Sequence, residues 1–220
     1  MILIKPSYEI LAINGADLLL MEKAGRTCYK SESKGAPAAF LKSKIKAKHL
    51  TIIEHGSMTV KFIVDRGFTH ELVRHRMAVY SQESTRYCNY SGGVTFIIPP
   101  WVNILEGEYD WEECDPAEIA DPYTSDFRWF QAMQEAEMSY LDLLGKNWSP
   151  QQARTVLPNS LKTEIVMTAN FREWRLVFEQ RALGLTGKPH PQMSEIMIPL
   201  MNEMKDKIPA IFGSLGEEKE

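Results

Sequence analysis

The spacing of hydrophobic and polar residues along the chain predicts several helices around a modest sheet. Residues 57–65 alternate with a period of two, which is typical of a half-buried strand, and their apolar positions are Met58, Val60, Phe62 and Val64. Short apolar runs predict two further strands, at residues 2–4 and 94–98. Apolar residues that recur every three or four positions predict helices over residues 16–23, 37–50, 70–79, 125–145, 159–183 and 193–208. We therefore expect a mixed α/β (α+β) fold in which helices flank a central sheet.

Two of these helices carry local signals of their own. Thr69 is a suitable N-cap for the helix over residues 70–79. Pro199 lies inside the last helix, where it predicts a kink.

Acidic residues concentrate in one segment. Residues 103–127 hold nine Asp and Glu residues and no Lys or Arg, whereas residues 1–100 hold 14 basic residues against 8 acidic ones. The segment shows no helical or strand period and lacks the spacing of a calcium loop. We interpret it as a solvated insertion in a single domain that spans residues 1–220, with a metal-binding loop as the alternative.

Composition narrows the class of protein without indicating its chemistry. The chain has 220 residues, of which 44% are hydrophobic and 25% charged, and this is typical of a globular protein with a full core. No apolar run approaches the ~18 residues that a membrane span requires. Three cysteines are an odd number without zinc spacing, which argues against a disulfide scaffold. We expect a cytoplasmic protein without a membrane partner.

The first segment with candidate chemistry is residues 74–87. It combines Arg74, His75 and Arg76 with a hydroxyl- and amide-rich stretch that ends in Arg86. The planar guanidinium of Arg suits a phosphate or the carbonyl edge of a pyrimidine. Glu71 lies three and four residues before Arg74 and His75, so a helix would bring the three together. A solvated basic helix is the alternative interpretation.

Arginines also gather in the expected helix over residues 159–183. Asn170 and Arg181 are eleven residues apart, about three helical turns, so they would lie near one face. Arg175 and Arg181 stand among apolar residues, where a charged group needs a partner. Solvated arginines are again the alternative.

Several common types of site are not supported by the sequence. The five histidines lack the spacing of His-Glu-x-x-His or of a zinc finger, so we expect no metal site. The chain has no Gly-x-Ser-x-Gly nucleophile elbow, no Gly-x-Gly-x-x-Gly and no P-loop. Any nucleotide must therefore be held by side chains and irregular turns.

The residues Arg74-His75-Arg76 followed by Ser84-x-Arg86 resemble the signature of flavin-dependent thymidylate synthases, Arg-His-Arg-x-x-Ser-x-Asn-x-x-Ser-x-Arg. Val79 and Ser81 depart from it, at its first Ser and its Asn. Four other segments are similar to the family, and they are Glu54-His55, Arg154 with Val156-Leu157-Pro158, Asn170-x-Arg172 with Arg181, and His190-x-Gln192-x-x-Glu195-Ile196. The resemblance covers residues 26–205, apart from the acidic segment.

The resemblance implies the reductive methylation of dUMP to dTMP. Methylenetetrahydrofolate would supply the carbon, FAD would carry the hydride and NADPH would reduce the flavin. The family fold assembles as a homotetramer whose active sites are shared between subunits, so the implied partners are these small molecules and further copies of the chain.

The resemblance also implies a role for individual residues. The implied dUMP-binding residues are Glu71, Arg74, Gln82, Glu83, Ser84, Thr85, Arg86, Arg154 and Arg181. The implied FAD-binding residues are His49, Thr51, Arg74, His75, Arg76, Gln82, Asn170 and Arg172.

Arg181 is the implied catalytic residue. A guanidinium beside N3 of the uracil would stabilise negative charge that conjugation carries to C5. We assign Ser84 to substrate binding because no adjacent general base would activate it, and Cys88 to packing. A nucleic-acid-binding module that uses the basic N-terminal half is the alternative function, but a pI near 5.8 argues against it. A histidine-based metal hydrolase is a third possibility.

Overall fold

Seven strands form two sheets in the part of the chain that the computed structural model describes, which is residues 1–33, 35–110 and 115–217. The strands are β1 (Ile2–Ile4), β2 (Ser7–Asn14), β3 (Ser57–Asp65), β4 (Ala78–Gln82), β5 (Thr95–Ile97), β6 (Gly107–Glu108) and β7 (Lys162–Asn170). One sheet has the order β5-β1-β6 and the other has the order β2-β3-β7-β4. The expected mixed α/β class is confirmed, with two sheets instead of one.

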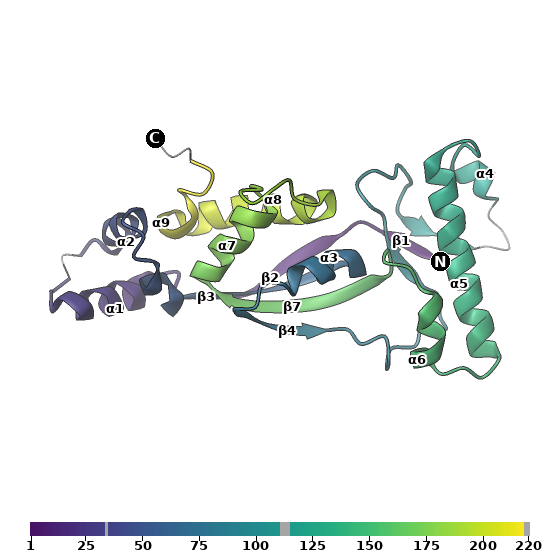
Figure 1. Ribbon diagram of the computed structural model, residues 1–220, viewed down its shortest axis with the longest axis horizontal. Coiled ribbons are helices and arrows are strands. Elements are labelled where there is room, and N and C mark those ends of the chain that lie inside the picture. The colour runs from purple at the N-terminus through teal and green to yellow at the C-terminus, as the bar shows by residue number, and fades with distance from the viewer. Residues whose placement is uncertain (34, 111–114, 218–220) are drawn as a thin grey trace. The chain divides into compact units, whose positions relative to one another are not determined.

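The helices vary widely in length. They are α1 (Leu19–Tyr29), α2 (Pro37–Lys46), α3 (Arg66–Leu72), α4 (Pro116–Ile119), α5 (Ser125–Gly145), α6 (Pro150–Ala153), α7 (Phe171–Arg181), α8 (Pro191–Lys207) and α9 (Pro209–Phe212), and Leu50–His55 and Arg154–Val156 form the 3₁₀ turns η1 and η2. Figure 1 shows that β7 leads directly into α7. Among the described residues, none of the helices combines the length and the apolar character needed to cross a membrane.

Contacts divide the described chain into two compact units. Unit 1 contains Met1–Ser7, Phe62–Leu72 and Ser81–Ile165, and unit 2 contains Tyr8–Lys61, Val73–Tyr80 and the described residues from Val166 onward. The strands of the larger sheet each contribute residues to both units. The single domain expected from the sequence stays a prediction.

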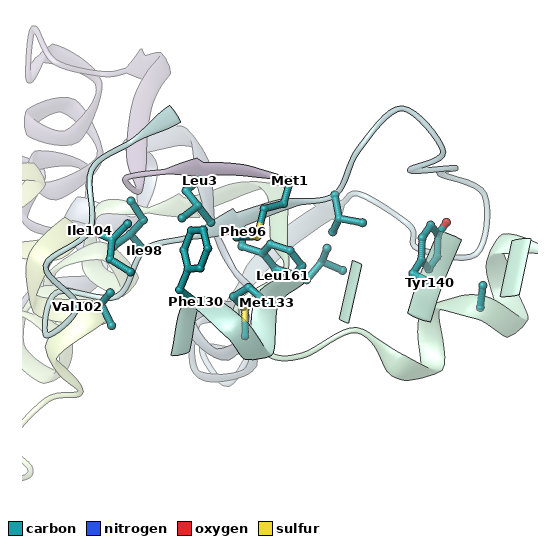
Figure 2. Packing of buried hydrophobic residues seen from close by; sticks show 12 residues of the cluster. Met1, Leu3, Phe96, Ile98, Val102, Ile104, Phe130, Met133, Tyr140 and Leu161 are labelled. Atoms are coloured by element: carbon teal, nitrogen blue, oxygen red, sulfur yellow. The ribbon is translucent and has the colours of Figure 1, made fainter. Parts of the chain in front are cut away.

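The core of unit 1 forms where α5 packs on the smaller sheet. Parallel pairing of β1 with β5 sets Leu3 opposite Phe96, and Figure 2 shows both side chains beside Phe130 of α5. All three side chains are fully buried. The helix begins where the Thr124 hydroxyl accepts a hydrogen bond from the Phe127 N–H. Its predicted span, residues 125–145, is confirmed.

Unit 2 is held together by aromatic residues of α7 and by methionines of α8. The buried Trp174 donates its Nε1–H to the carbonyl oxygen of Met58 at 2.9 Å, which ties α7 to β3. Met193, Met197 and Met204 lie on the buried face of α8, and Pro199 lies inside that helix, as the periodicity predicted. Gly25 of α1 is needed for packing, because an added Cβ would lie 2.8 Å from the ring of Phe40.

The prediction of a helix over residues 70–79 is wrong. The helix begins at Arg66, where the Asp65 carboxylate accepts the Phe68 N–H at 2.6 Å, and it ends at Leu72. Thr69 therefore lies inside α3 instead of capping it, and Ala78–Gln82 forms β4. Arg74 and His75 lie in the connecting loop, so the helical spacing that was expected to join them to Glu71 does not apply.

The prediction of one long helix over residues 159–183 is also wrong. Lys162–Asn170 is a strand whose side chains alternate strictly between half-buried and buried positions. The buried positions are Thr163, Ile165, Met167 and Ala169. The helix starts only at Phe171, because the Asn170 side chain accepts the Glu173 N–H at 2.9 Å as an N-cap.

Smaller differences concern helix ends and the acidic segment. The first helix starts at Leu19 instead of residue 16 and continues through Gly25 to Tyr29, and the second ends at Lys46, before a left-handed Lys48 and the turn η1. In the described part of residues 103–127, β6 pairs with β1 and Ile104 is buried, so the segment is not entirely a solvated excursion. Its residues 111–114, including Cys114, lie outside the described residues.

Candidate functional site

In unit 1, the implied nucleotide-binding residues form a turn directly after β4. Gln82 ends the strand and donates its amide N–H groups to the hydroxyls of Thr69 and Thr163, at 3.1 and 3.3 Å. The Glu83 N–H then bonds to the Glu164 carbonyl at 2.8 Å. These bonds fix the start of the turn on α3 and β7.

The carboxylate of Glu83 is the centre of a polar network. It accepts the hydroxyl of Tyr90 at 2.7 Å and the ammonium of Lys162 at 3.1 Å, and Lys162 also contacts Glu164 at 2.7 Å. Burial and the bond to Glu83 raise the pKa of Tyr90, so its hydroxyl stays a donor. Burial alone would lower the pKa of Lys162, but its bonds to Glu164 and Glu83 raise it. Glu83 therefore supports the turn through its contacts with Tyr90 and Lys162.

The remainder of the turn presents hydroxyls and two arginines. The Ser84 carbonyl accepts the N–H groups of Tyr87 and Cys88, at 3.0 and 2.9 Å. Arg154 donates to the buried hydroxyl of Thr85 at 2.8 Å, which joins η2 to the turn. Arg86 is exposed and lies against Tyr87, to whose hydroxyl it donates at 2.7 Å. The structure thus brings Gln82, Glu83, Ser84, Thr85, Arg86 and Arg154 together, while Glu71 lies in the last turn of α3.

In unit 2, Arg181 contacts His75. The Arg181 Nε–H donates to His75 Nε2 at 3.2 Å, and the other ring nitrogen, Nδ1, lies 3.4 Å from the Glu173 carboxylate. The Tyr80 hydroxyl donates to the His75 carbonyl at 2.8 Å. Burial, and secondly the charge of Arg181, lower the pKa of His75 to about 4, so its imidazole is neutral at pH 7. Burial raises the pKa of Glu173.

A groove of about 490 Å³ lies along the start of α7. It is lined by Leu50, Glu54, Met77, Asn170, Arg172, Glu173, Arg175, Leu176 and Glu179. Arg172 forms an ion pair with Glu54 at 2.6 Å, and the buried Arg175 donates to the Ile211 carbonyl and lies 3.9 Å from Glu179. Arg175 therefore has the partners that its apolar surroundings required.

The groove accounts for only part of the implied flavin-binding set. Asn170 and Arg172 line it, whereas His49 and Thr51 are exposed on either side of Leu50 at the start of η1. Arg74 and Arg76 are exposed in the loop after α3. Gln82 belongs to unit 1, so the flavin-binding and nucleotide-binding sets are largely separated between the two units.

Sequence reasoning missed Tyr90, Lys162 and Glu173 as supporting partners, and it singled out Glu54 without predicting its ion pair with Arg172. One of them had a local signal. Asn170 followed by Glu173 has the spacing of a capping box, which marks a helix start at Phe171. Lys162 and Glu54 make contacts across 79 and 118 residues, which leave no spacing pattern, and Tyr90 lies seven residues after Glu83 in an irregular turn.

A cavity of about 530 Å³ lies along α1, between Leu19 and Ser33, and contains none of the implied site residues. Within the described residues, no three His, Cys, Asp or Glu side chains gather as a metal site would require.

Comparisons with known proteins agree over most of the chain. Residues 9–210 match the family model described as "Thymidylate synthase complementing protein". A protein named flavin-dependent thymidylate synthase from Mycobacteroides abscessus is 32% identical over 208 residues, which cover 88% of this chain and 78% of that protein. A protein of the same name from Mycobacterium sp. strain JLS is 33% identical over 217 residues, covering 93% and 82%.

The fold also matches a solved structure. The crystal structure of the UMP/dUMP methylase PolB from Streptomyces cacaoi, bound with 5-Br dUMP, superposes with a TM-score of 0.76. The match covers 97% of this chain and 96% of that one at 20% sequence identity. At this identity the similarity establishes the fold.

Proposed function

Because the chain belongs to the family of flavin-dependent thymidylate synthases, we propose that it is an enzyme that methylates dUMP to dTMP. The relatives' names and the dUMP analogue in the similar structure support this substrate. The observation that carries the proposal is the half-buried guanidinium of Arg181, anchored to His75 through Nε at 3.2 Å. A positioned cation of this kind is what the chemistry at the pyrimidine requires.

In this proposal Arg181 is the catalytic residue. Its guanidinium would lie beside N3 of the uracil and stabilise the negative charge that builds up there. Conjugation spreads this charge to C5, which would then bond to the one-carbon unit of methylenetetrahydrofolate and lose its proton. The bond between that carbon and the folate nitrogen breaks, and tetrahydrofolate leaves. The carbon arrives at the methylene level, so completing the methyl group requires a hydride.

The turn after β4 is proposed to bind the nucleotide. Arg86 is exposed and Arg154 is half-buried at Thr85, so two guanidiniums and the Ser84 hydroxyl are available to a phosphate-bearing ligand. Glu83 is occupied by Tyr90 and Lys162, and its proposed contribution to binding is to hold this turn in place. The other members of the proposed dUMP-binding set are Glu71, Arg74, Gln82, Thr85 and Arg181.

The groove at α7 is proposed to bind part of FAD. A dinucleotide carries phosphates that need cationic and N–H donors, and Arg172 and Asn170 line a groove of a size common for small ligands. The amide of Asn170 still has its NH₂ group to donate, because only its oxygen caps α7. When bound, the flavin supplies the hydride, with NADPH as the reductant. His49, Thr51, Arg74, His75, Arg76 and Gln82 are the remaining proposed contacts.

We further propose that the chain acts as a homotetramer with shared sites, and in the cytoplasm. Large apolar side chains are exposed on α1 and around β4, and this supports association: Leu19 is 59% exposed, Met77 70% and Val79 71%. Assembly would bring the nucleotide-binding and flavin-binding sets into complete active sites. We propose no metal and no nucleic acid among its ligands.

The decisive experiment measures flavin binding and proton release at C5. Purified protein should bind added FAD, seen as visible absorbance that stays with the protein on gel filtration. With methylenetetrahydrofolate and NADPH present, it should release tritium from 5-tritiated dUMP. A protein that neither binds FAD nor releases tritium does not have this function. Light scattering separately tests for a mass four times the 25.2 kDa of one chain.

A further inference from the structure

Both ring nitrogens of His75 face charged side chains of α7. Nε2 lies 3.2 Å from Arg181 Nε, and Nδ1 lies 3.4 Å from the Glu173 carboxylate. His75 and Glu173 are only 4% and 7% exposed, so water has little access to these contacts. The His75 ring therefore lies between two side chains of α7. Glu173 comes from the first turn of that helix and Arg181 from its last turn.

The partners of His75 determine which nitrogen carries its proton. A guanidinium has only N–H donors and no acceptor, so the contact with Arg181 requires a lone pair on Nε2. The proton of the neutral ring must then be on Nδ1, where it faces Glu173. A doubly protonated ring would set an N–H against the N–H of Arg181, and the low pKa of His75 prevents this at neutral pH.

We propose that Glu173 is a positioning residue for Arg181. In this role Glu173 accepts a hydrogen bond from the Nδ1–H of His75, so the proton stays on Nδ1. Nε2 then remains available as the acceptor that fixes the Arg181 guanidinium. The catalytic part of this inference rests on the proposed function, in which Arg181 contacts the pyrimidine.

The arrangement tolerates either protonation state of the acid. Burial raises the pKa of Glu173, but a protonated carboxyl group still has an oxygen that can accept a hydrogen bond. The backbone of His75 is also fixed, because its carbonyl accepts the Tyr80 hydroxyl at 2.8 Å. With Nε anchored, the plane of the Arg181 guanidinium loses rotational freedom before substrate arrives.

The first test reads the proton position directly and needs no turnover. Long-range ¹H–¹⁵N correlation spectra of the full chain with ¹⁵N-labelled histidine rings distinguish the two neutral tautomers and the imidazolium. The His75 signal is identified by its loss in His75→Gln. We expect the Nδ1–H tautomer at pH 7. An Nε2–H tautomer or an imidazolium would overturn the proposal.

The second test compares two substitutions of Glu173 with a control. Glu173→Gln keeps an acceptor oxygen, whereas Glu173→Leu removes it at similar volume. Glu203→Leu is the matched control, because Glu203 is another carboxylate of unit 2, and it accepts the Tyr8 hydroxyl at 3.0 Å from its place in α8. We expect Glu173→Leu to shift His75 toward the Nε2–H tautomer and to lower kcat for tritium release about tenfold, the loss expected of one hydrogen bond to a charged group.

The remaining outcomes separate positioning from a merely structural role. Glu173→Gln should stay within about threefold of the wild type in kcat and keep the Nδ1–H tautomer, and Glu203→Leu should change neither. Equal losses in Glu173→Gln and Glu173→Leu, or a wild-type tautomer in Glu173→Leu, would contradict the proposal. If the wild-type protein releases no tritium, the proposed function fails, while the tautomer still decides whether Glu173 orients His75.

Discussion

Replacing Arg181 with alanine tests the central step of the proposed chemistry. Arg181 is the last residue of α7 and is half-buried, with its Nε–H bonded to His75 at 3.2 Å. A guanidinium held in this way meets developing charge without reorganising, and removing one such preorganised donor typically costs about 100- to 1000-fold in kcat. We therefore expect Arg181→Ala to lose turnover by about that factor while FAD binding is retained.

The same substitution has a second, independent consequence. The pKa of His75 is lowered to about 4 by burial first and by the charge of Arg181 second. Removing the guanidinium eliminates only the second effect, so the pKa should rise but stay below its ordinary value of 6.5. An NMR titration of the His75 ring measures this shift in protein that need not be active.

The assay follows tritium release from 5-tritiated dUMP at saturating nucleotide, beside a flavin titration of each variant. Arg181→Lys serves as the matched variant, because lysine keeps the charge but lacks the planar fork and the Nε–H that His75 accepts. We expect its activity to lie between the wild type and Arg181→Ala. An Arg181→Ala enzyme within about threefold of the wild-type kcat, or an unchanged pKa of His75, would refute this reasoning.

Three further predictions concern stability. Between pH 6.5 and about 4, His75 is protonated in the unfolded chain and neutral in the folded chain, so the free energy of unfolding should fall as pH drops through this window. Urea unfolding of the wild type and of His75→Gln measures this, and equal pH slopes in the two proteins would contradict it. Glu83→Ala leaves the Tyr90 hydroxyl without its acceptor and Lys162 with Glu164 alone, and should lower the free energy of unfolding by about 1–3 kcal/mol; an unchanged urea midpoint would count against it. Phe130→Ala empties a fully buried site and should cost about 3–5 kcal/mol in the same assay, so a loss below ~1 kcal/mol would disprove the assignment of the core.

Elements with a strong local period were predictable from the sequence. β3 has the predicted bounds because its four apolar residues alternate without interruption. The two longest helices, α5 and α8, were found because their apolar residues persist over several turns. In each case one face is buried along the whole element, so the local pattern and the tertiary environment require the same structure.

The two wrong helices fail because pairing within a sheet overrides helix propensity. Two of the buried positions of β7 are Thr163 and Ala169, whose side chains are too weakly hydrophobic to reveal the alternation of a strand. Its half-buried residues also occur in helices, so they do not exclude a helix. The N-cap at Asn170 was a readable stop signal for any helix that began earlier.

Some residues of the candidate site could also be identified from the sequence, and others could not. Arg74 to Arg86 could be selected from the sequence because their order matches a family signature. The contacts that support them could not, since Lys162 reaches Glu83 across 79 residues and Arg181, itself selected from the sequence, contacts His75 across 106. Contacts over such distances are made by the fold and leave no spacing in the sequence.

The strand β4 gives the two departures from the signature a physical meaning. In a helix, Val79 and Ser81 would have pointed in different directions, but in a strand successive side chains alternate between faces. Both therefore share the exposed face of β4, while Tyr80 and Gln82 share the half-buried face that bonds to His75, Thr69 and Thr163. Val79, at 71% exposed, and Ser81 leave the supporting bonds of the site intact. Their departure can change only what binds at that face, which in the proposed homotetramer is a ligand or another subunit.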